Sequence, residues 1–331
     1  MPAVTSYRHG LTAYHPNRMG NPNPPKRGLV QGWSPGPAKR NVKFLRSVDE
    51  RELSGDGWAI TLTVRDCPPT PEAWSKVVRA WVERQRRAGM IRLHWVMEFQ
   101  RRGVPHLHAA AWYEPRGSAG GSAGRREDAR TNDAPQGLPP GHAATVAWVD
   151  VAGKYGATLM GQHARQIDGA VGWFQYMAKH CGRSEVHYQR QRDSAPAAWD
   201  SSPRVWGHRG DWKLQDPITT ELTRRQFFQL RRIVRRRRIA RVRRLVPGSW
   251  SELQPRMGLL TRPQLRDAPV GPLGHSKPLR QALRELQRAR AMHRCSDRKL
   301  SEVRPVNDWF DQDEQLRIFQ ASSGAAPPPA G

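Results

Sequence analysis

The sequence predicts an α+β fold: an antiparallel sheet with helices packed on it, followed by a basic helical C-terminal region. Segments 58–64 and 91–100 alternate apolar and polar side chains, as half-buried strands do, and 104–113 predicts a third strand. Between the first two, residues 70–87 follow a helical period, and a later segment, 222–245, is helical in spacing and rich in arginine. This order favours one sheet domain with its helices on one face.

The N-terminal residues 1–39 predict a basic, flexible arm, because they are rich in Pro, Gly, Asn and Arg and show no sustained period. We place the sheet domain at 40–213 and expect a short helix across 34–48. The first strand, 58–64, has large apolar side chains at alternate positions, which puts them on one face.

The helix at 70–87 has clear boundary signals. Thr70 is a preferred N-cap residue, and Pro71 suits the first helical position. Gly89 follows a basic last turn and marks the end.

The rest of the domain is organised around a hairpin. Residues 101–103 predict the turn between its two strands, and 114–141 predicts a low-complexity, disordered surface loop. Three more elements are expected: a strand at 143–151, a helix at 163–181 and a closing strand at 204–213.

The C-terminal part divides into two regions. Residues 214–248 predict an arginine-rich helix, since 11 of the 24 residues in 222–245 are arginine. Residues 249–331 predict a mostly polar region with a helix near 277–294 and a disordered tail.

The charge balance indicates a polyanionic partner. The 331 residues hold 55 Lys and Arg against 29 Asp and Glu, a formal net charge of +26, which favours nucleic-acid binding. No apolar run approaches the ~20 residues that span a bilayer, so we expect no membrane contact. The three cysteines form no CxxC pair, and the N-terminus lacks the apolar stretch of a signal peptide. We therefore expect a cytoplasmic protein of a bacterial host.

A candidate metal site lies on the hairpin. His106 and His108 are two apart on a strand, so both point to one face. A three-residue turn at 101–103 pairs Gln100 with Val104 and sets Glu98 opposite His106, with Cβ atoms roughly 4.5–5.5 Å apart. Two imidazoles and a carboxylate then form a divalent-cation site with mixed nitrogen and oxygen ligands.

Two other interpretations of these residues stay open. Both histidines can be structural members of a half-buried strand. A metal oxygenase also uses two histidines and a carboxylate, and a cupin-like site would take its acid from Glu114, beyond the histidine pair.

A second element follows on the expected helix. Tyr176 and Lys179 are three residues apart, so both can reach one site, and His180 and Trp173 share that helix face. Alone, this spacing is far more typical of an amphipathic helix with a tyrosine and a lysine on its surface, and it gains weight only beside the metal site.

Together these motifs resemble those of the HUH endonuclease superfamily. Within it, they are most similar to the single-tyrosine rolling-circle replication initiators of plasmid and phage type. The matching pieces, in order, are Ile60-Thr-Leu-Thr63, Pro105-His-Leu-His108 and Tyr176-Met-Ala-Lys179. The resemblance covers about residues 28–213. Two-tyrosine members carry a second tyrosine one helical turn later, where this chain has His180.

The resemblance implies a chemistry. His106, His108 and Glu98 would hold Mg²⁺ or Mn²⁺, and Tyr176 would attack the scissile phosphate of single-stranded origin DNA, giving a 5′-phosphotyrosine link. Lys179 would lower the pKa of the tyrosine, stabilise the phenolate or contact the phosphate. No Walker A motif is present, so unwinding would need a host helicase, and synthesis a host polymerase.

The arginine-rich helix predicts contact with DNA phosphates. The residues we expect to make it are Arg224, Arg225, Arg231, Arg232, Arg235, Arg236, Arg237 and Arg238. A transposase or relaxase with the same chemistry, and a non-catalytic arginine-rich nucleic-acid-binding protein, remain as alternatives.

Overall fold

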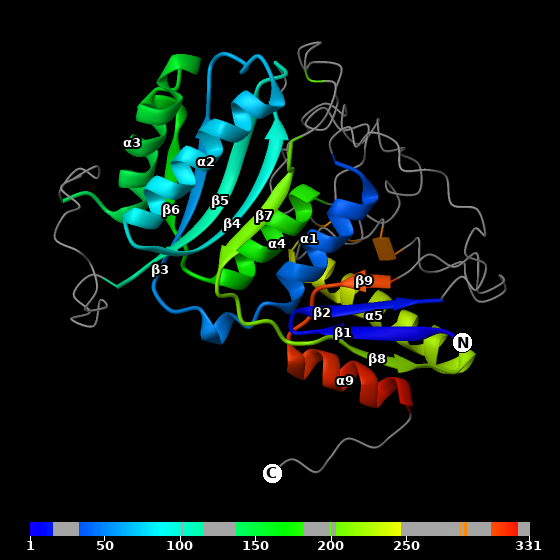
Figure 1. The fold of residues 1–331 in the computed structure, drawn as a ribbon. Coiled ribbons are helices and arrows are strands. Elements are labelled where there is room, and N and C mark those ends of the chain that lie inside the picture. Colours follow the sequence, from blue (N-terminus) through cyan, green and yellow to red (C-terminus); the bar gives the residue numbers. More distant parts are fainter. Residues whose placement is uncertain are drawn as a thin grey trace, which may run out of the picture. The chain divides into compact units, whose positions relative to one another are not determined.

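The computed structural model of the chain forms two compact units (Figure 1). The central unit is Asn23–Asp216, and the terminal unit combines Met1–Pro22 with Pro217–Gly331. The residues that the structure describes are 1–15, 33–100, 102–115, 137–181, 199, 203–245, 282, 285, 288, 289 and 306–323. The expected disordered loop and C-terminal tail lie largely outside them.

The central unit is built on a five-stranded antiparallel sheet, which confirms the predicted α+β class. Its strand order is β6-β3-β5-β4-β7, so the hairpin strands occupy the middle. The strands are β3 (Asp56–Thr63), β4 (Met90–Phe99), β5 (Pro105–Tyr113), β6 (His163–Gln166) and β7 (Trp206–Gly210). The predicted strands at 58–64, 91–100, 104–113 and 204–213 are all present.

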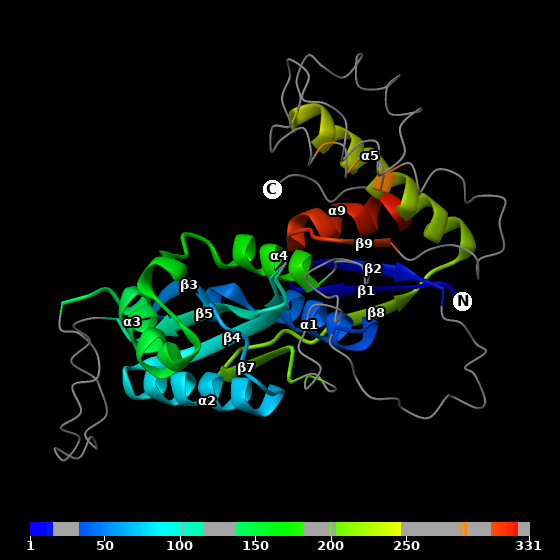
Figure 2. The same ribbon diagram turned by 90° about the horizontal axis from the view of Figure 1, so that it is seen from above.

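Helices cover both faces of this sheet, so the expectation of helices on one face is wrong. The α-helices in the described part of this unit are α1 (Pro35–Ser47), α2 (Pro71–Arg87), α3 (Pro140–Ala152) and α4 (Ala170–Cys181). Figure 2 shows α2 and α4 on opposite sides of the sheet. The central strand of the sheet is buried on both faces, so each face is covered by helices.

The face under α2 and α3 is packed with tryptophans. Trp74 and Trp81 of α2 meet Trp148 of α3 edge to face, at centroid distances of 5.5 and 6.2 Å. The Trp148 indole N–H donates to the carbonyl of Thr63 at 2.9 Å. This apolar layer ties the helices to the end of β3 and fixes the sheet from behind.

The opposite face, under α1 and α4, holds the imidazoles. His94 of β4 is fully buried and lies 2.7 Å from the side-chain oxygen of Asn41, which accepts from its ring N–H. Burial lowers the pKa of His94 to about 3, so this imidazole is neutral. Phe44 of α1 stacks on His208 of β7 at 4.2 Å.

The predicted strand at 143–151 is wrong, because these residues belong to helix α3. Pro139 is the N-cap and Pro140 the first helical residue, a helix-start signal that the apolar run concealed. The buried residues Ala144, Ala147 and Trp148 recur at three- and four-residue spacing, which suits a helix.

The predicted helix at 163–181 begins seven residues late. Residues 163–166 form the edge strand β6 instead, which pairs with β3 so that Ala164 faces Ile60. Helix α4 starts at Ala170, directly after Gly169.

Two predicted helices are confirmed. The Thr70 side chain accepts a hydrogen bond from the Ala73 N–H at 3.1 Å, and Gly89 has a φ of +89° just beyond the end of α2. Helix α1 lies within the expected 34–48.

The terminal unit contains a second antiparallel sheet, of order β8-β1-β2-β9. Its strands are β1 (Ala3–Tyr7), β2 (Gly10–Tyr14), β8 (Ile218–Glu221) and β9 (Val306–Asp308). Among its described residues, α5 (Arg224–Leu245) and α9 (Gln312–Ser323) are helices. The expected flexible arm at 1–39 is therefore wrong for residues 3–14, and for 35–39, which begin α1. Val4 and Leu11 join Phe227, Leu230 and Phe310 in one buried cluster.

Of the helix expected near 277–294, the structure describes Ala282, Glu285, Arg288 and Ala289, each in helical conformation. Among the described residues, no helix is both long enough and apolar enough to cross a membrane.

Candidate metal centre

The β4–β5 hairpin has the predicted geometry. The Gln100 N–H donates to the Val104 carbonyl at 2.8 Å, and Gly103 closes the turn with a φ of +75°. Glu98 is directly opposite His106 in the ladder, as the three-residue turn requires. The next pair on this face sets Val96 opposite His108.

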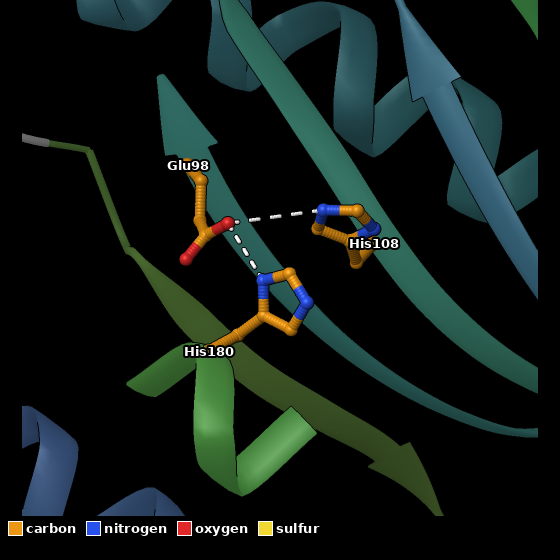
Figure 3. Close-up of side chains that lie close together, drawn as sticks. All are labelled: Glu98, His108 and His180. Atoms are coloured by element: carbon orange, nitrogen blue, oxygen red, sulfur yellow. Dashed lines mark hydrogen bonds and ion pairs between the residues drawn. The ribbon is translucent and has the colours of Figure 1, made fainter. Parts of the chain in front are cut away.

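Three buried side chains converge above this hairpin (Figure 3). Glu98 Oε2 lies 2.8 Å from His180 Nδ1 and 3.8 Å from His108 Nε2. The three ligand atoms lie within 4.8 Å of one another, and the residues are 0, 7 and 4% exposed for Glu98, His108 and His180. The group joins strand β4, strand β5 and helix α4.

The chemistry of this donor set fits a divalent cation. One carboxylate oxygen and two imidazole nitrogens, taken out of water together, provide a negative charge and two neutral lone pairs. Three protein ligands leave coordination positions for oxygens from outside the protein. The group is thus compatible with the predicted divalent metal.

His106 is placed beside this group. Its Nε2 lies 2.8 Å from Nε2 of His108, and it is 6% exposed. The other nitrogen of His108, Nδ1, lies 3.2 Å from the Thr61 hydroxyl of β3, a contact that holds the ring with Nε2 toward Glu98. The predicted ligand role of His106 stays a prediction.

His180 was not predicted as a ligand. A signal was available in its spacing, because it lies one helical turn after Tyr176 and must share that face. Its partner Glu98 is 82 residues away, a pairing that only the fold provides.

Tyr176 lies over the group and reaches solvent. Its ring centroid is 4.3 Å from that of His180 and 6.2 Å from that of His108, both edge to face. It is 40% exposed, although the histidines below it are buried. Trp173, one turn earlier, packs against it at 5.4 Å. Lys179 lies on the same helix, and its side chain is outside the described residues.

The predicted DNA-binding arginines of α5 fall into two groups. Arg231 and Arg238 are 3 and 6% exposed. Arg238 Nε bonds Asp308 at 2.8 Å, and Arg237 pairs with Glu314 of α9. The remaining predicted residues are accessible: Arg224, Arg225, Arg232 and Arg236 are exposed, and Arg235 is partly exposed.

Comparison with known proteins places the chain in a family. The family model described as replication-associated protein ORF2/G2P matches residues 57–183, from β3 through α4. A putative replication protein of Xylella fastidiosa strain Temecula1 is 47% identical over 256 residues, which cover 74% of this chain and 88% of the relative. This chain belongs to the ORF2/G2P family.

Two further relatives agree. A putative replication protein of Xylella fastidiosa strain 9a5c is 45% identical over 73% of this chain and 81% of its own length. The replication-associated protein G2P of Pseudomonas phage Pf3 is 41% identical, over 73% of this chain and 82% of its own length. No solved structure matches the chain. The ORF2/G2P match includes every residue of the candidate site.

We expect Mn²⁺ to raise the melting temperature of this ORF2/G2P protein. An ion that binds only the folded state stabilises that state by RT ln(1 + [L]/Kd). Each kcal/mol of added stability raises the melting temperature by about 2–4 °C in a domain of this size. The increase should be lost in Glu98→Gln and His180→Gln, measured by differential scanning fluorimetry with and without chelator.

Glu114→Gln is the matched control for this measurement. Glu114 is an exposed carboxylate just past β5, and it is the acid that a cupin-like site would use. An Mn²⁺ response that survives Glu98→Gln but disappears in Glu114→Gln would place the ion elsewhere.

Proposed function

We propose that this protein initiates rolling-circle replication of a plasmid or phage by nicking and rejoining single-stranded origin DNA through a 5′-phosphotyrosine. The observation that supports this most is the position of Tyr176, solvent-accessible and directly above a buried carboxylate–histidine group. The names of its relatives, replication proteins and a phage replication-associated protein, support the initiator role.

The reaction is a transesterification at phosphorus. The Tyr176 phenolic oxygen attacks the scissile phosphate, forming a Tyr–O–P bond while the P–O3′ bond breaks. The phenol proton leaves, the released 3′ oxygen takes up a proton, and no bond energy is lost to hydrolysis. A 3′-hydroxyl can therefore reverse the reaction and reseal the strand without ATP.

The residues below Tyr176 are suited to hold a divalent cation. We assign Glu98, His108 and His180 to it, with His106 as a further ligand within reach of His108. When bound, such a cation would neutralise charge on the phosphate oxygens. Thr61 keeps the His108 ring oriented, and burial of Glu98 keeps water from competing for the carboxylate.

Tyr176 and the histidines are brought together by rigid elements. The tyrosine stands on α4, the histidine pair on the central strand β5, and Glu98 on its neighbour β4. An antiparallel sheet with the histidine pair on its middle strand and a tyrosine helix over it supports the assignment to an HUH palm. Lys179 is on the same helix, and we propose that it acts on the phenolate or the phosphate.

A single tyrosine performs the nicking in this proposal. The position of a second tyrosine is taken by His180, whose ring is bonded to Glu98. His180 thus belongs to the buried group, and Tyr176 is the nucleophile.

The proposed partners follow from this reaction. The origin must be single-stranded where Tyr176 attacks, so we infer that a host helicase and polymerase complete the round in the cytoplasm of a bacterium. A transposase or relaxase shares the chemistry, but the three relatives are all named as replication proteins.

We further propose that the outer face of α5 binds DNA phosphates. Arg225, Arg232, Arg236 and Arg243 are exposed and follow one another by seven, four and seven residues, which places them in one row. The buried Arg231 and Arg238 are excluded from this role, since their side chains stabilise the terminal unit.

Tyr176→Phe should abolish covalent attachment to DNA. Purified protein, Mn²⁺ and single-stranded DNA of its own replicon should give a protein–DNA adduct on a denaturing gel, and His106→Ala should reduce the adduct strongly. Tyr155→Phe is the control, because Tyr155 is a partly exposed tyrosine of the same unit.

Tyr188 lies 12 residues after Tyr176 in the sequence and is another candidate nucleophile. An adduct that persists in Tyr176→Phe and disappears in Tyr155→Phe or Tyr188→Phe would contradict the assignment. Tight DNA binding without any adduct would favour the non-catalytic binding protein.

Arg232→Gln/Arg236→Gln should weaken single-stranded DNA binding at all sequences alike. Each lost phosphate contact lowers the slope of log K against log salt by about 0.7, so the pair should lower it by about 1.4. Arg79→Gln/Arg87→Gln removes the same charge from exposed positions of α2 and is the control. Equal slopes in the two variants would assign the effect of α5 to net charge alone.

A further inference from the structure

An exposed apolar tip lies beside the proposed nicking site. The short 3-10 turn η3 (Leu159–Gly161) precedes strand β6, and its Leu159 and Met160 side chains are 56 and 100% exposed. Among the described residues of the central unit, the other exposed large apolar side chains are Tyr176 and Leu214, at 40 and 50%. Two adjacent apolar residues at one tip lose favourable burial unless something covers them.

Hydrogen bonds hold this tip against the strand next to the histidines. The Thr63 hydroxyl donates to the Gly161 carbonyl at 2.7 Å, and the Thr63 N–H donates to the Gln162 side-chain oxygen at 2.7 Å. The Gln162 amide donates back to the carbonyls of Thr63 and Thr158, at 3.2 and 2.7 Å. A turn fixed by four such bonds presents Leu159 and Met160 in one place.

The register of the sheet puts this anchor next to the proposed metal ligands. Thr63 is directly opposite His106 in the β3–β5 ladder, so their side chains lie on the same face. The Thr63 hydroxyl that holds Gly161 is therefore on the histidine-bearing face. The tip is one strand away from the residues under Tyr176.

Two exposed cations lie near the end of β3, the strand to which the tip is hydrogen-bonded. Lys154 is exposed. The carbonyl of the next residue, Tyr155, accepts hydrogen bonds from the backbone N–H groups of Arg65 and Asp66, just after β3. Arg102, also exposed, donates to the Val64 carbonyl at 2.7 Å. Exposed cations near an apolar tip match a polynucleotide, whose phosphates are anionic and whose bases are apolar on their faces.

We infer that Leu159 and Met160 form a nucleobase contact that holds the single strand beside the scissile phosphate. Leucine and methionine side chains pack on base faces or insert between neighbouring bases in other nucleic-acid complexes. The tip would hold the DNA strand at one position, so that a single phosphate lies over the proposed metal ligands, where Tyr176 attacks it. This inference rests on the proposed nicking function and names the feature of the DNA that this part of the site binds.

Leu159→Ser/Met160→Ser tests the inference, because both side chains are exposed and their loss leaves the core intact. Binding is measured by fluorescence anisotropy in a Tyr176→Phe background, with a labelled oligonucleotide that spans the mapped nick. We expect binding to weaken about tenfold, equivalent to about 1.4 kcal/mol, with an unchanged salt slope. Leu214→Ser, which removes another exposed leucine of the same unit, should leave binding unchanged.

An abasic scan of the same oligonucleotide locates the contact. In the Tyr176→Phe protein, an abasic site at one or two positions near the nick should weaken binding by the same factor of about ten. In the Leu159→Ser/Met160→Ser variant, an abasic site at those positions should weaken binding no further. Removing the side chains and removing the base then disrupt the same interaction. Equal affinity of the variant, or additive losses at every position, would overturn the inference.

The two proposals fail in different ways. Absence of a covalent adduct in the wild-type protein contradicts the nicking function. An adduct of normal yield, combined with unchanged binding by the double serine variant, contradicts the base contact alone.

Discussion

The site depends on one buried carboxylate. Glu98 is fully buried, and an unpaired charge there would cost several kcal/mol. Its oxygen lies 2.8 Å from His180 of α4 and 3.8 Å from His108 of β5, so each partner compensates part of this cost. The same contact fixes helix α4 on the sheet and brings Tyr176, one turn before His180, to the open side of the group. One hydrogen bond, between His180 and Glu98, thus both satisfies the buried carboxylate and positions the tyrosine.

The two faces of the central sheet have different roles. Behind the sheet, Trp74, Trp81 and Trp148 form an apolar layer that reaches the end of β3. In front, polar side chains of β3, β4 and β5 face α4, with Thr61 orienting His108. The rear layer lets the strands hold their register, and that register sets Glu98 and Thr63 on either side of His106. The tip at η3 is fixed by the same ladder through Thr63.

Local patterns in the sequence predicted the local parts of this site. A three-residue turn is enough to pair Glu98 with His106, and helical spacing is enough to put Tyr176 and His180 on one face. The bond between Glu98 and His180 joins segments 82 residues apart, so no local rule could supply it. The N-terminal hairpin pairs locally, from Ala3 with Tyr14 to Tyr7 with Gly10, but its outer edges pair with residues 218–221 and 306–308, which no local rule could supply. Helix α3 was missed because an apolar, β-branched run suits a buried strand equally well.

The most direct test of the central claim is to locate the ion. Crystals of the Tyr176→Phe protein soaked in Mn²⁺ would give an anomalous difference map with a signal from the metal. We expect a peak bonded to Glu98, His108 and His180, directly below residue 176. A strong peak elsewhere in the central unit, or one bonded to histidines without Glu98, would contradict it.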